Sequence, residues 1–245
     1  MAQARRPWEA KGIASHALQG VDFSVRAGEI VGLAGVEGNG QRDFLRTLAG
    51  LQPASGTMVV AGRSIRLSNP VAALEGGIVY LPGDRHAEGL FLPLTVRENM
   101  TALVLDSLAT LGLVQRRRET SLVEKQIKGL SVKTPSAETP IKSLSGGNQQ
   151  KVVMARALAT DPRVLVLIDP TAGVDVKSKE ALLAMAERAR DEGRAVIVSS
   201  GELDDLRGCD RVLVMFRGRI VQAFAAGWAD HELIASIEGV DLNEA

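Results

Sequence analysis

Short runs of aliphatic residues recur along the chain and alternate with stretches in which apolar residues have helical spacing. The run Val164–Ile168 contains no polar side chain. Uninterrupted runs of this kind are typical of strands buried on both faces of a parallel sheet. Their alternation with helices predicts an α/β fold built on a mostly parallel sheet. The predicted strands are Ile30–Ala34, Ile78–Leu81, Val164–Ile168, Ala195–Val198, Arg211–Phe216 and Arg219–Ala223.

A looser alternation of apolar and polar residues flanks the first of these strands. It predicts short antiparallel strands within Ile13–Val25 and a hairpin-like pair, Met58–Ala61 and Ser64–Leu67. Residues 1–11 are charged and lack an apolar core, so no signal peptide is visible. We expect these first residues to be a frayed leader or a linker remnant.

The middle of the chain has a different character. Apolar residues follow a helical spacing from Thr95 to Leu113, and Thr95 and Glu98 form a capping-box pattern at its start. A second helix is predicted from Gln115 to about Leu130. We therefore interpret residues 94–143 as a helical subdomain inserted between strands of the sheet.

The composition narrows the class of protein. Lys plus Arg and Asp plus Glu are 29 each, and this balance argues against a dedicated nucleic-acid binder, so no nucleic-acid partner is expected. The single cysteine, Cys209, excludes an internal disulfide framework and a multi-cysteine metal site, which favours a reduced compartment. No apolar run approaches the ~20 residues of a membrane span, so work at a membrane would require a docking partner.

A glycine-rich loop joins the strand Ile30–Ala34 to a predicted helix, Gln41–Leu51. Strand, glycine loop and helix together form the architecture that cradles phosphate groups on backbone N–H donors. The glycine spacing is that of the P-loop, but Gln41 and Arg42 stand where that motif has lysine and a hydroxyl residue. The loop is therefore either a modified phosphate cradle or a tight turn that binds nothing.

A second candidate anion site is the segment Leu144–Gln150, which reads LSGGNQQ and opens a predicted helix from Gln149 to Thr160. Two glycines after a serine at a helix start leave backbone N–H groups bare, and these attract anions. The alternative is an ordinary helix start, in which the Ser145 side chain caps the helix and the glycines make a turn.

The order of these motifs resembles that of the ATP-binding-cassette (ABC) ATPases over nearly the whole chain. The versions LSGGNQQKVVMARAL, VEGNGQ, PGDR and CDRVLVMFRGRI are similar to the second cassette of bacterial ATPases that drive uptake of simple sugars or purine nucleosides. The resemblance implies a P-loop NTPase fold of the ABC-ATPase type, with an antiparallel β subdomain and an inserted α-helical subdomain. It implies one nucleotide-binding domain over 1–245, with an ATPase core at 12–93 and 144–225, the helical subdomain at 94–143 and a C-terminal helical tail at 226–245.

The resemblance also implies roles for individual positions. Cassettes of this family pair head to tail and bind ATP between the phosphate loop of one and the signature helix of the other. The expected cofactor-binding residues are Gly35, Glu37, Gly38, Asn39, Gly40, Gln41, Arg42 and Asp43 in the phosphate loop, Ser145, Gly146, Gly147, Asn148 and Gln149 in the signature segment, and Asp175 at the dimer interface.

Residues Pro82–Arg85 would be a switch segment, and 94–143 would receive a membrane subunit. The implied partners are a second cassette (an identical or a different chain), permease subunits and, indirectly, a solute-binding protein. The implied location is the cytoplasmic face of the cell membrane.

Several positions depart from the pattern of the family. Ile168 stands where the family has its Mg²⁺-anchoring acid, and Asp169 is either a shortened catalytic base or a displaced metal acid. Ser200 or Gly201 replaces the histidine that contacts the γ-phosphate in most cassettes. We therefore expect weak ATP binding, doubtful Mg²⁺ coordination and little hydrolysis at this chain's own site. Two alternatives stay open: a self-sufficient ATPase in which Asp169 and Arg42 compensate, and a non-transport ABC protein.

Overall fold

The computed structural model describes residues 8–60, 62–66 and 69–239. The chain forms two compact units. The first comprises residues up to Tyr80 together with 163–169 and the chain from Ala186 onward, and the second comprises 81–162 and 170–185.

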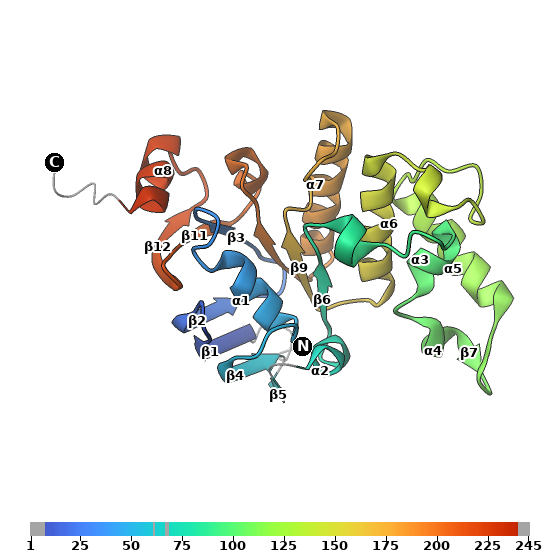
Figure 1. Cartoon of the computed structure of the whole chain (residues 1–245), viewed down its shortest axis with the longest axis horizontal. Helices are drawn as coiled ribbons and strands as arrows, with labels where there is room; N and C mark the ends of the chain where they lie inside the picture. Colours follow the sequence, from blue (N-terminus) through green and yellow to red (C-terminus); the bar gives the residue numbers. More distant parts are fainter. Residues whose placement is uncertain (1–7, 61, 67–68, 240–245) are drawn as a thin grey trace. The chain divides into compact units, whose positions relative to one another are not determined.

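A six-stranded sheet forms the centre of the first unit (Figure 1), with the strand order β12-β11-β3-β10-β9-β6. β3 pairs in parallel with β10 and β11, β10 pairs in parallel with β9, and β12 is antiparallel to β11. Every residue of β3, β9 and β10 is buried, which accounts for their uninterrupted apolar sequences. The prediction of an α/β fold with a mostly parallel sheet is confirmed. The strands are β3 (Ile30–Ala34), β6 (Ile78–Leu81), β9 (Val164–Ile168), β10 (Ala195–Ser199), β11 (Arg211–Phe216) and β12 (Arg219–Ala225).

A four-stranded antiparallel sheet, in the order β2-β1-β4-β5, belongs to the same unit. Its strands are β1 (Trp8–Ala14), β2 (Gln19–Val25), β4 (Ser55–Val60) and β5 (Arg63–Ile65). The expectation of a frayed leader over 1–11 is wrong from Trp8 onward, because Trp8 pairs with Val25 and is only 7% exposed. Two ends of the predicted hairpin, Ala61 and Leu67, lie outside the described residues.

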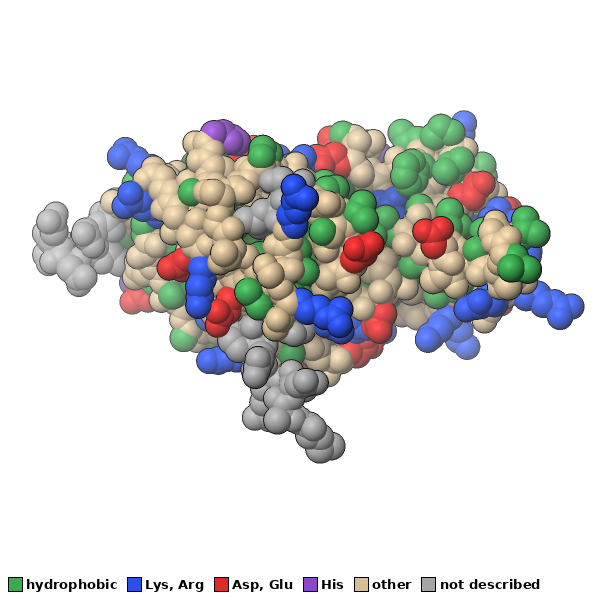
Figure 2. All heavy atoms as spheres, turned by 90° about the horizontal axis from the view of Figure 1, so that it is seen from below, with side chains coloured by type: hydrophobic (Ala, Val, Ile, Leu, Met, Phe, Trp, Pro, Cys, Tyr) green, Lys and Arg blue, Asp and Glu red, His purple; other side chains and the backbone are tan. Residues whose placement is uncertain are grey.

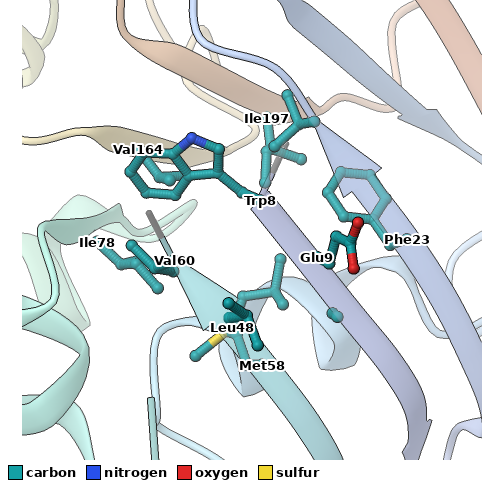
Figure 3. Close-up of a pocket in the computed structure, with 12 residues that line it drawn as sticks. Trp8, Glu9, Phe23, Leu48, Met58, Val60, Ile78, Val164 and Ile197 are labelled. Carbon is teal, nitrogen blue, oxygen red and sulfur yellow. The ribbon is translucent and has the colours of Figure 1, made fainter. Parts of the chain in front are cut away.

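The apolar core of the first unit includes side chains from both of these sheets. Figure 3 shows the Trp8 indole among Leu48, Val60, Ile78, Val164 and Ile197, beside a cavity of about 20 Å³. A space of this size holds at most one water molecule, and its lining is apolar. Trp8 thus packs with side chains of the central sheet and helps to join β1 to it.

The remaining elements of the first unit are shorter. They are α1 (Gln41–Leu48), α2 (Pro70–Glu75), the 3₁₀ turn η4 (Leu203–Leu206) and α8 (Asp230–Glu238). Cys209, next to η4, is 3% exposed, and its burial raises the pKa of the thiol to about 12. Cys209 is therefore a buried packing residue rather than a reactive thiol. The helix α7 (Val176–Asp191) contributes residues to both units.

The second unit is mainly helical. It contains the π-helical turn η2 (Arg85–Gly89), α3 (Val96–Thr101), α4 (Leu105–Leu108), α5 (Arg116–Gly129), the 3₁₀ turn η3 (Ile141–Ser143) and α6 (Gly146–Ala159). The predicted capping box is present, because Thr95 Oγ1 accepts from the Glu98 N–H and the Glu98 carboxylate accepts from the Thr95 N–H. The second predicted helix corresponds to α5.

The prediction of one helix from Thr95 to Leu113 is wrong. The segment breaks after α3, and a small hairpin of β7 (Ala109–Thr110) and β8 (Leu113–Val114) follows α4. The turn of this hairpin has positive φ angles, 52° at Leu111 and 78° at Gly112, which a helix does not allow. Because the apolar spacing continues through the break, periodicity alone could not detect it.

The surface carries charges of both signs. Figure 2 shows acidic and basic side chains interspersed on one face of the molecule, in keeping with the zero formal charge of the sequence. None of the helices within the described ranges combines the length and the apolar character that a membrane crossing requires.

Candidate functional site

The phosphate loop, residues 35–43, connects β3 to α1 in the first unit. Three of its glycines have positive φ angles: 156° at Gly35, 87° at Gly38 and 105° at Gly40. Gly40 is the N-cap of α1, and the first intrahelical bond runs from the Phe44 N–H to the Gly40 carbonyl, so the N–H groups of the residues before Phe44 precede the helical ladder. A side chain at Gly35 would approach the Met215 carbonyl oxygen within 2.6 Å. The loop therefore has the backbone of a phosphate cradle.

Gln41, at the lysine position of the P-loop pattern, is buried, with 7% exposure. Its amide Nε2 donates to the Val36 carbonyl across the loop, at 3.2 Å. A glutamine amide is neutral, so the loop has no positive charge at the position where the P-loop lysine reaches the β- and γ-phosphates. What remains at this position is a hydrogen-bond donor that closes the loop on itself.

Asp169 directly follows β9, at the carboxyl end of that strand. Its φ angle is 41°, and its N–H donates to the Ser199 carbonyl at 2.7 Å. One carboxylate oxygen, Oδ1, accepts from the Gly201 N–H at 3.2 Å. The other, Oδ2, lies 3.1 Å from Nη2 of Arg42. Both oxygens are therefore engaged within the unit, and Ile168 beside them is 1% exposed.

Ser200 lies beside Asp169, but its hydroxyl is engaged elsewhere. Ser200 Oγ donates to Asp205 Oδ2 at 2.7 Å and accepts from the Glu202 N–H at 3.1 Å, and Ser200 is 8% exposed. Sequence reasoning missed Asp205, since nothing in its local pattern marks it. The bond to Asp205 fixes the turn after β10 and leaves no obvious role for the Ser200 hydroxyl as a ligand.

Most of the predicted phosphate-loop residues meet in one pocket with a volume of about 330 Å³. Asn39 is outside this pocket, since its side-chain oxygen accepts from the Arg217 N–H and its carbonyl accepts from the Gly218 N–H. Asn39 thereby ties the loop to the β11–β12 turn. The lining comprises Gly35, Glu37, Gly38, Gly40, Gln41, Arg42, Asp43, Ile168, Asp169, Ser199, Ser200 and Gly201.

The signature segment, residues 144–150, lies in the second unit. Its helix, α6, begins at Gly146, three residues earlier than the predicted start at Gln149. Ser145 is the N-cap but makes no side-chain capping bond, so the alternative of an ordinary capped helix start is wrong. Instead Asn148 Nδ2 donates to Ser145 Oγ at 2.9 Å, and Asn148 Oδ1 accepts from the Lys133 N–H at 2.7 Å. Among the described residues, Ser145 therefore leaves the first N–H groups of α6 without a side-chain cap.

Gln149 faces inward rather than outward. It is 6% exposed, its Oε1 lies 3.0 Å from His86 Nε2, and its Nε2 donates to the Ile141 carbonyl at 3.3 Å. These contacts hold the first turn of α6 against η2 and η3. Gln149 is placed to position the helix start rather than to contact a ligand with its side chain.

The two glycines of the signature segment each face a different side chain. Arg85 Nη1 donates to the Ala172 carbonyl at 2.9 Å, and a methyl group at Gly146 would come within 2.8 Å of Arg85 Nη2. A methyl group at Gly147 would overlap Ser178, coming within 2.6 Å of its Cβ. Sequence reasoning placed Arg85 only in the switch segment and missed Ser178. Because both positions lack a side chain, Arg85 and Ser178 can lie close to the backbone of α6.

Asp175 lies next to this helix start and accepts two hydrogen bonds from Ser178, from the hydroxyl at 2.8 Å and from the N–H at 3.0 Å. These bonds hold the pKa of the Asp175 carboxyl below its usual range, the hydroxyl bond contributing most. Asp175 is therefore negatively charged at neutral pH, and its bonds to Ser178 cap the start of α7.

The different surroundings of the two glycines give a prediction. We expect Gly147→Ala to lower the free energy of unfolding by about 1–3 kcal/mol, because the new methyl group meets the Cβ of a short side chain that cannot move aside. Gly146→Ala should cost less, because its nearest neighbour is the end of a long arginine side chain. Urea denaturation measures both.

The control for this comparison is Gly129→Ala at the end of α5. A methyl group there meets no heavy atom within 4 Å, so the helix preference of alanine should make the variant neutral or slightly stabilised. A Gly147→Ala protein as stable as Gly129→Ala would contradict the packing described here.

Comparisons with known proteins agree with this fold. A protein-family model described as ABC transporter matches residues 18–172. The ribose import ATP-binding protein RbsA 1 of Rhizobium johnstonii is 42% identical over 224 residues, which cover 89% of this chain and 44% of that protein. A putative ribose/galactose/methyl galactoside import ATP-binding protein of Halalkalibacterium halodurans is 39% identical over 219 residues, or 89% of this chain and 42% of that protein. The chain thus spans less than half the length of these curated relatives.

Solved structures share the fold. A nucleotide-free ATP-binding cassette from an ABC transporter superimposes with a TM-score of 0.78 at 22% identity, covering 97% of this chain and 96% of that one. A cassette solved in its ADP conformation gives a TM-score of 0.76 at 23% identity and covers 97% of each chain. At these identities the likeness shows the fold alone, which is that of an ABC ATPase cassette.

Proposed function

The chain belongs to the ABC transporter family, and we propose that it is an ATP-binding cassette of an importer for sugars or nucleosides. In this proposal it lends its signature segment to the ATP of a partner cassette, while its own ATP site is degenerate. The single observation that carries the proposal is the contrast between an uncapped, complete signature helix start and a phosphate loop that lacks its lysine and its hydroxyl.

The substrate class rests on the relatives. Those named above are import proteins for ribose or for ribose, galactose and methyl galactoside, by their names. The sequence versions LSGGNQQ and VEGNGQ support placing this chain as a second cassette, because the resemblance in these segments is to that half of two-cassette ATPases. The domain boundaries expected from the resemblance, with 94–143 as the helical subdomain that docks on a permease, are part of the same proposal.

The proposal that this chain's own ATP site is degenerate is supported by contacts in the first unit. Phosphoryl transfer depends on charge neutralisation and on a positioned nucleophile, and each lost part can cost orders of magnitude in rate. Here Gln41 is neutral, Ile168 is apolar and Ser200 is bonded to Asp205. Asp169 could serve as a general base only if it left Arg42, which now neutralises its charge. The self-sufficient ATPase is therefore the weaker alternative.

The proposed role of the signature segment is supported by contacts in the second unit. The N–H groups of the first turn of α6 precede the helical ladder, and the side chain of the N-cap residue, Ser145, does not cap them. Such an N-terminus stabilises a developing negative charge on phosphate oxygens. The guanidinium of Arg85 lies near Gly146 and adds positive charge beside this surface. In the proposed role, Ser145, Gly146, Gly147 and Asn148 present the donors and Asp175 belongs to the dimer interface.

The experiment that tests the proposal compares hydrolysis by separate and mixed cassettes. The purified chain is assayed alone, then with a cassette whose phosphate loop ends in Gly-Lys-Ser/Thr and which co-purifies with it, and that cassette is assayed alone. We expect background hydrolysis by this chain and a rate for the mixture well above the sum of the two. Steady hydrolysis by this chain alone would favour the self-sufficient ATPase, and a purely additive mixture would contradict the proposal.

A further inference from the structure

The pocket of the phosphate loop contains an ion pair at the position where an ABC cassette holds a metal ion. Arg42 comes from the first turn of α1, and Asp169 follows β9. Their Nη2 and Oδ2 atoms are 3.1 Å apart, and both residues line the pocket of about 330 Å³. Arg42 stands at the sequence position of the P-loop hydroxyl that ligates Mg²⁺.

The residues of this pocket do not fit Mg²⁺. This ion requires oxygen ligands in a nearly octahedral arrangement, which P-loop proteins supply with the loop hydroxyl and a strand-end acid. Position 42 offers a guanidinium instead of a hydroxyl, and position 168 offers a buried aliphatic side chain. Both oxygens of Asp169 are engaged, by Arg42 and by the Gly201 N–H. Within the described residues no group of three acidic, histidine or cysteine side chains could hold a metal ion.

The same pocket keeps the parts that bind phosphate through the backbone. Gly35, Gly38 and Gly40 give the loop its positive φ angles, and the first residues of α1, Gln41–Asp43, line the pocket. The Arg42 side chain is 58% exposed, with Asp169 Oδ2 at 3.1 Å and Glu37 Oε1 at 4.0 Å, so it can turn from these carboxylates to an incoming anion. A guanidinium binds phosphate oxygens through two parallel hydrogen bonds.

We propose that this pocket binds the phosphates of a nucleotide without a divalent metal ion, with Arg42 supplying the positive charge. The inference rests on the proposed degeneracy of this site and specifies what the site still accepts. A Mg²⁺ ion carried in by the nucleotide would meet the guanidinium and be repelled by it, while gaining no oxygen ligand at positions 42 and 168. Metal-free ATP or ADP is therefore the preferred ligand. Glu37 and Asp43 also line the pocket, so binding is expected to be weak.

The experiment is isothermal titration of the full chain with ATP, once with EDTA and once with excess Mg²⁺. We expect the Kd in EDTA to be equal to or lower than the Kd in Mg²⁺. Arg42→Ala should raise the Kd at least about ten-fold in both buffers, as expected for loss of a charge-assisted hydrogen bond. The matched control is Arg63→Ala on exposed β5, which removes the same charge from the same unit and should leave both values unchanged.

A second variant is expected to reverse the preference for metal-free ATP over Mg²⁺-bound ATP. Arg42→Thr combined with Ile168→Asp restores the two missing oxygen ligands and should make ATP bind more tightly in Mg²⁺ than in EDTA. Circular dichroism shows whether Asp at the buried position 168 is tolerated, and Arg42→Thr alone serves if it is not, since its ATP affinity in EDTA should fall as in Arg42→Ala.

Three results would overturn the inference: tighter binding by the wild-type chain with Mg²⁺ than with EDTA, no binding at millimolar ATP in either buffer, or an unchanged Kd in Arg42→Ala. None of these would affect hydrolysis in the mixture with a partner cassette, because that assay depends on the signature segment. The two proposals can therefore fail separately.

Discussion

Ser145→Arg is expected to reduce ATP hydrolysis by the mixture of this chain and its partner cassette about 100-fold or more. Loss of one preorganised donor to a developing oxyanion typically costs 10²- to 10³-fold in kcat. Ser145 is exposed at the start of α6, where an arginine side chain would cover the N–H groups that, in the proposed role, contact the ATP of a partner cassette. The rate of ATP hydrolysis by the mixture at saturating ATP measures the effect.

Folding does not explain this expected loss. The Ser145 hydroxyl makes no capping bond, so the stability of α6 loses only the contact from Asn148. The control is Ser121→Arg, an exposed position on α5 in the same unit that adds the same charge and bulk. It should leave hydrolysis unchanged. Full activity of the Ser145→Arg mixture would show that the partner does not use this helix start, and the proposed division of labour would then be wrong.

The sequence predicted the central sheet well because its inner strands are buried on both faces, with every residue of β3, β9 and β10 buried. β3, β9 and β11 appear in the structure with the residues that the aliphatic runs indicated. Burial on both faces leaves no ambiguity about which positions must be apolar. The break between α3 and α4 could not be predicted in the same way, because apolar residues on both sides of it are used in packing whether or not the helix continues.

The backbone of the two candidate sites was also readable from the sequence, but the side-chain contacts were not. Glycines at fixed spacing indicate a phosphate cradle because they adopt the positive φ angles of such a loop without the strain that a side chain would add. The contact of Arg85 with the Ala172 carbonyl and the contact of Gly147 with Ser178 join segments that are far apart in the chain. A single sequence contains no signal for such pairs, so Ser178 and Asp205 became visible only in the structure.

The phosphate-loop pocket and the signature segment differ in how many residues of the family pattern they keep. In the first unit the chemistry is defined by substitutions, because Gln41, Arg42 and Ile168 each replace a group of known role in P-loop proteins. In the second unit the residues of the signature segment are kept. Ser145 does not cap the helix start with its side chain, and Arg85 lies close to Gly146. A cassette that supports catalysis by its partner is expected to lose catalytic residues of its own phosphate-loop pocket and to keep its signature segment.

The largest effect on stability is expected for Trp8→Ala. Replacing a buried tryptophan with alanine typically costs about 3–5 kcal/mol, because the neighbouring side chains relax only partly into the cavity. Trp8 is 7% exposed and lies among apolar side chains of the core in the first unit (Figure 3). The chain has two tryptophans, so Trp228 in the same unit reports the loss by fluorescence during urea denaturation.

Trp8→Phe is the matched control, since it keeps an aromatic ring in the core and should cost clearly less than the alanine variant. The comparison also decides between two descriptions of the start of the chain. If residues 8–11 were a frayed leader, as the sequence suggested, neither substitution would change the midpoint. A loss of several kcal/mol in Trp8→Ala alone requires instead that β1 is part of the folded core, because only a side chain removed from water leaves a cavity when it is truncated.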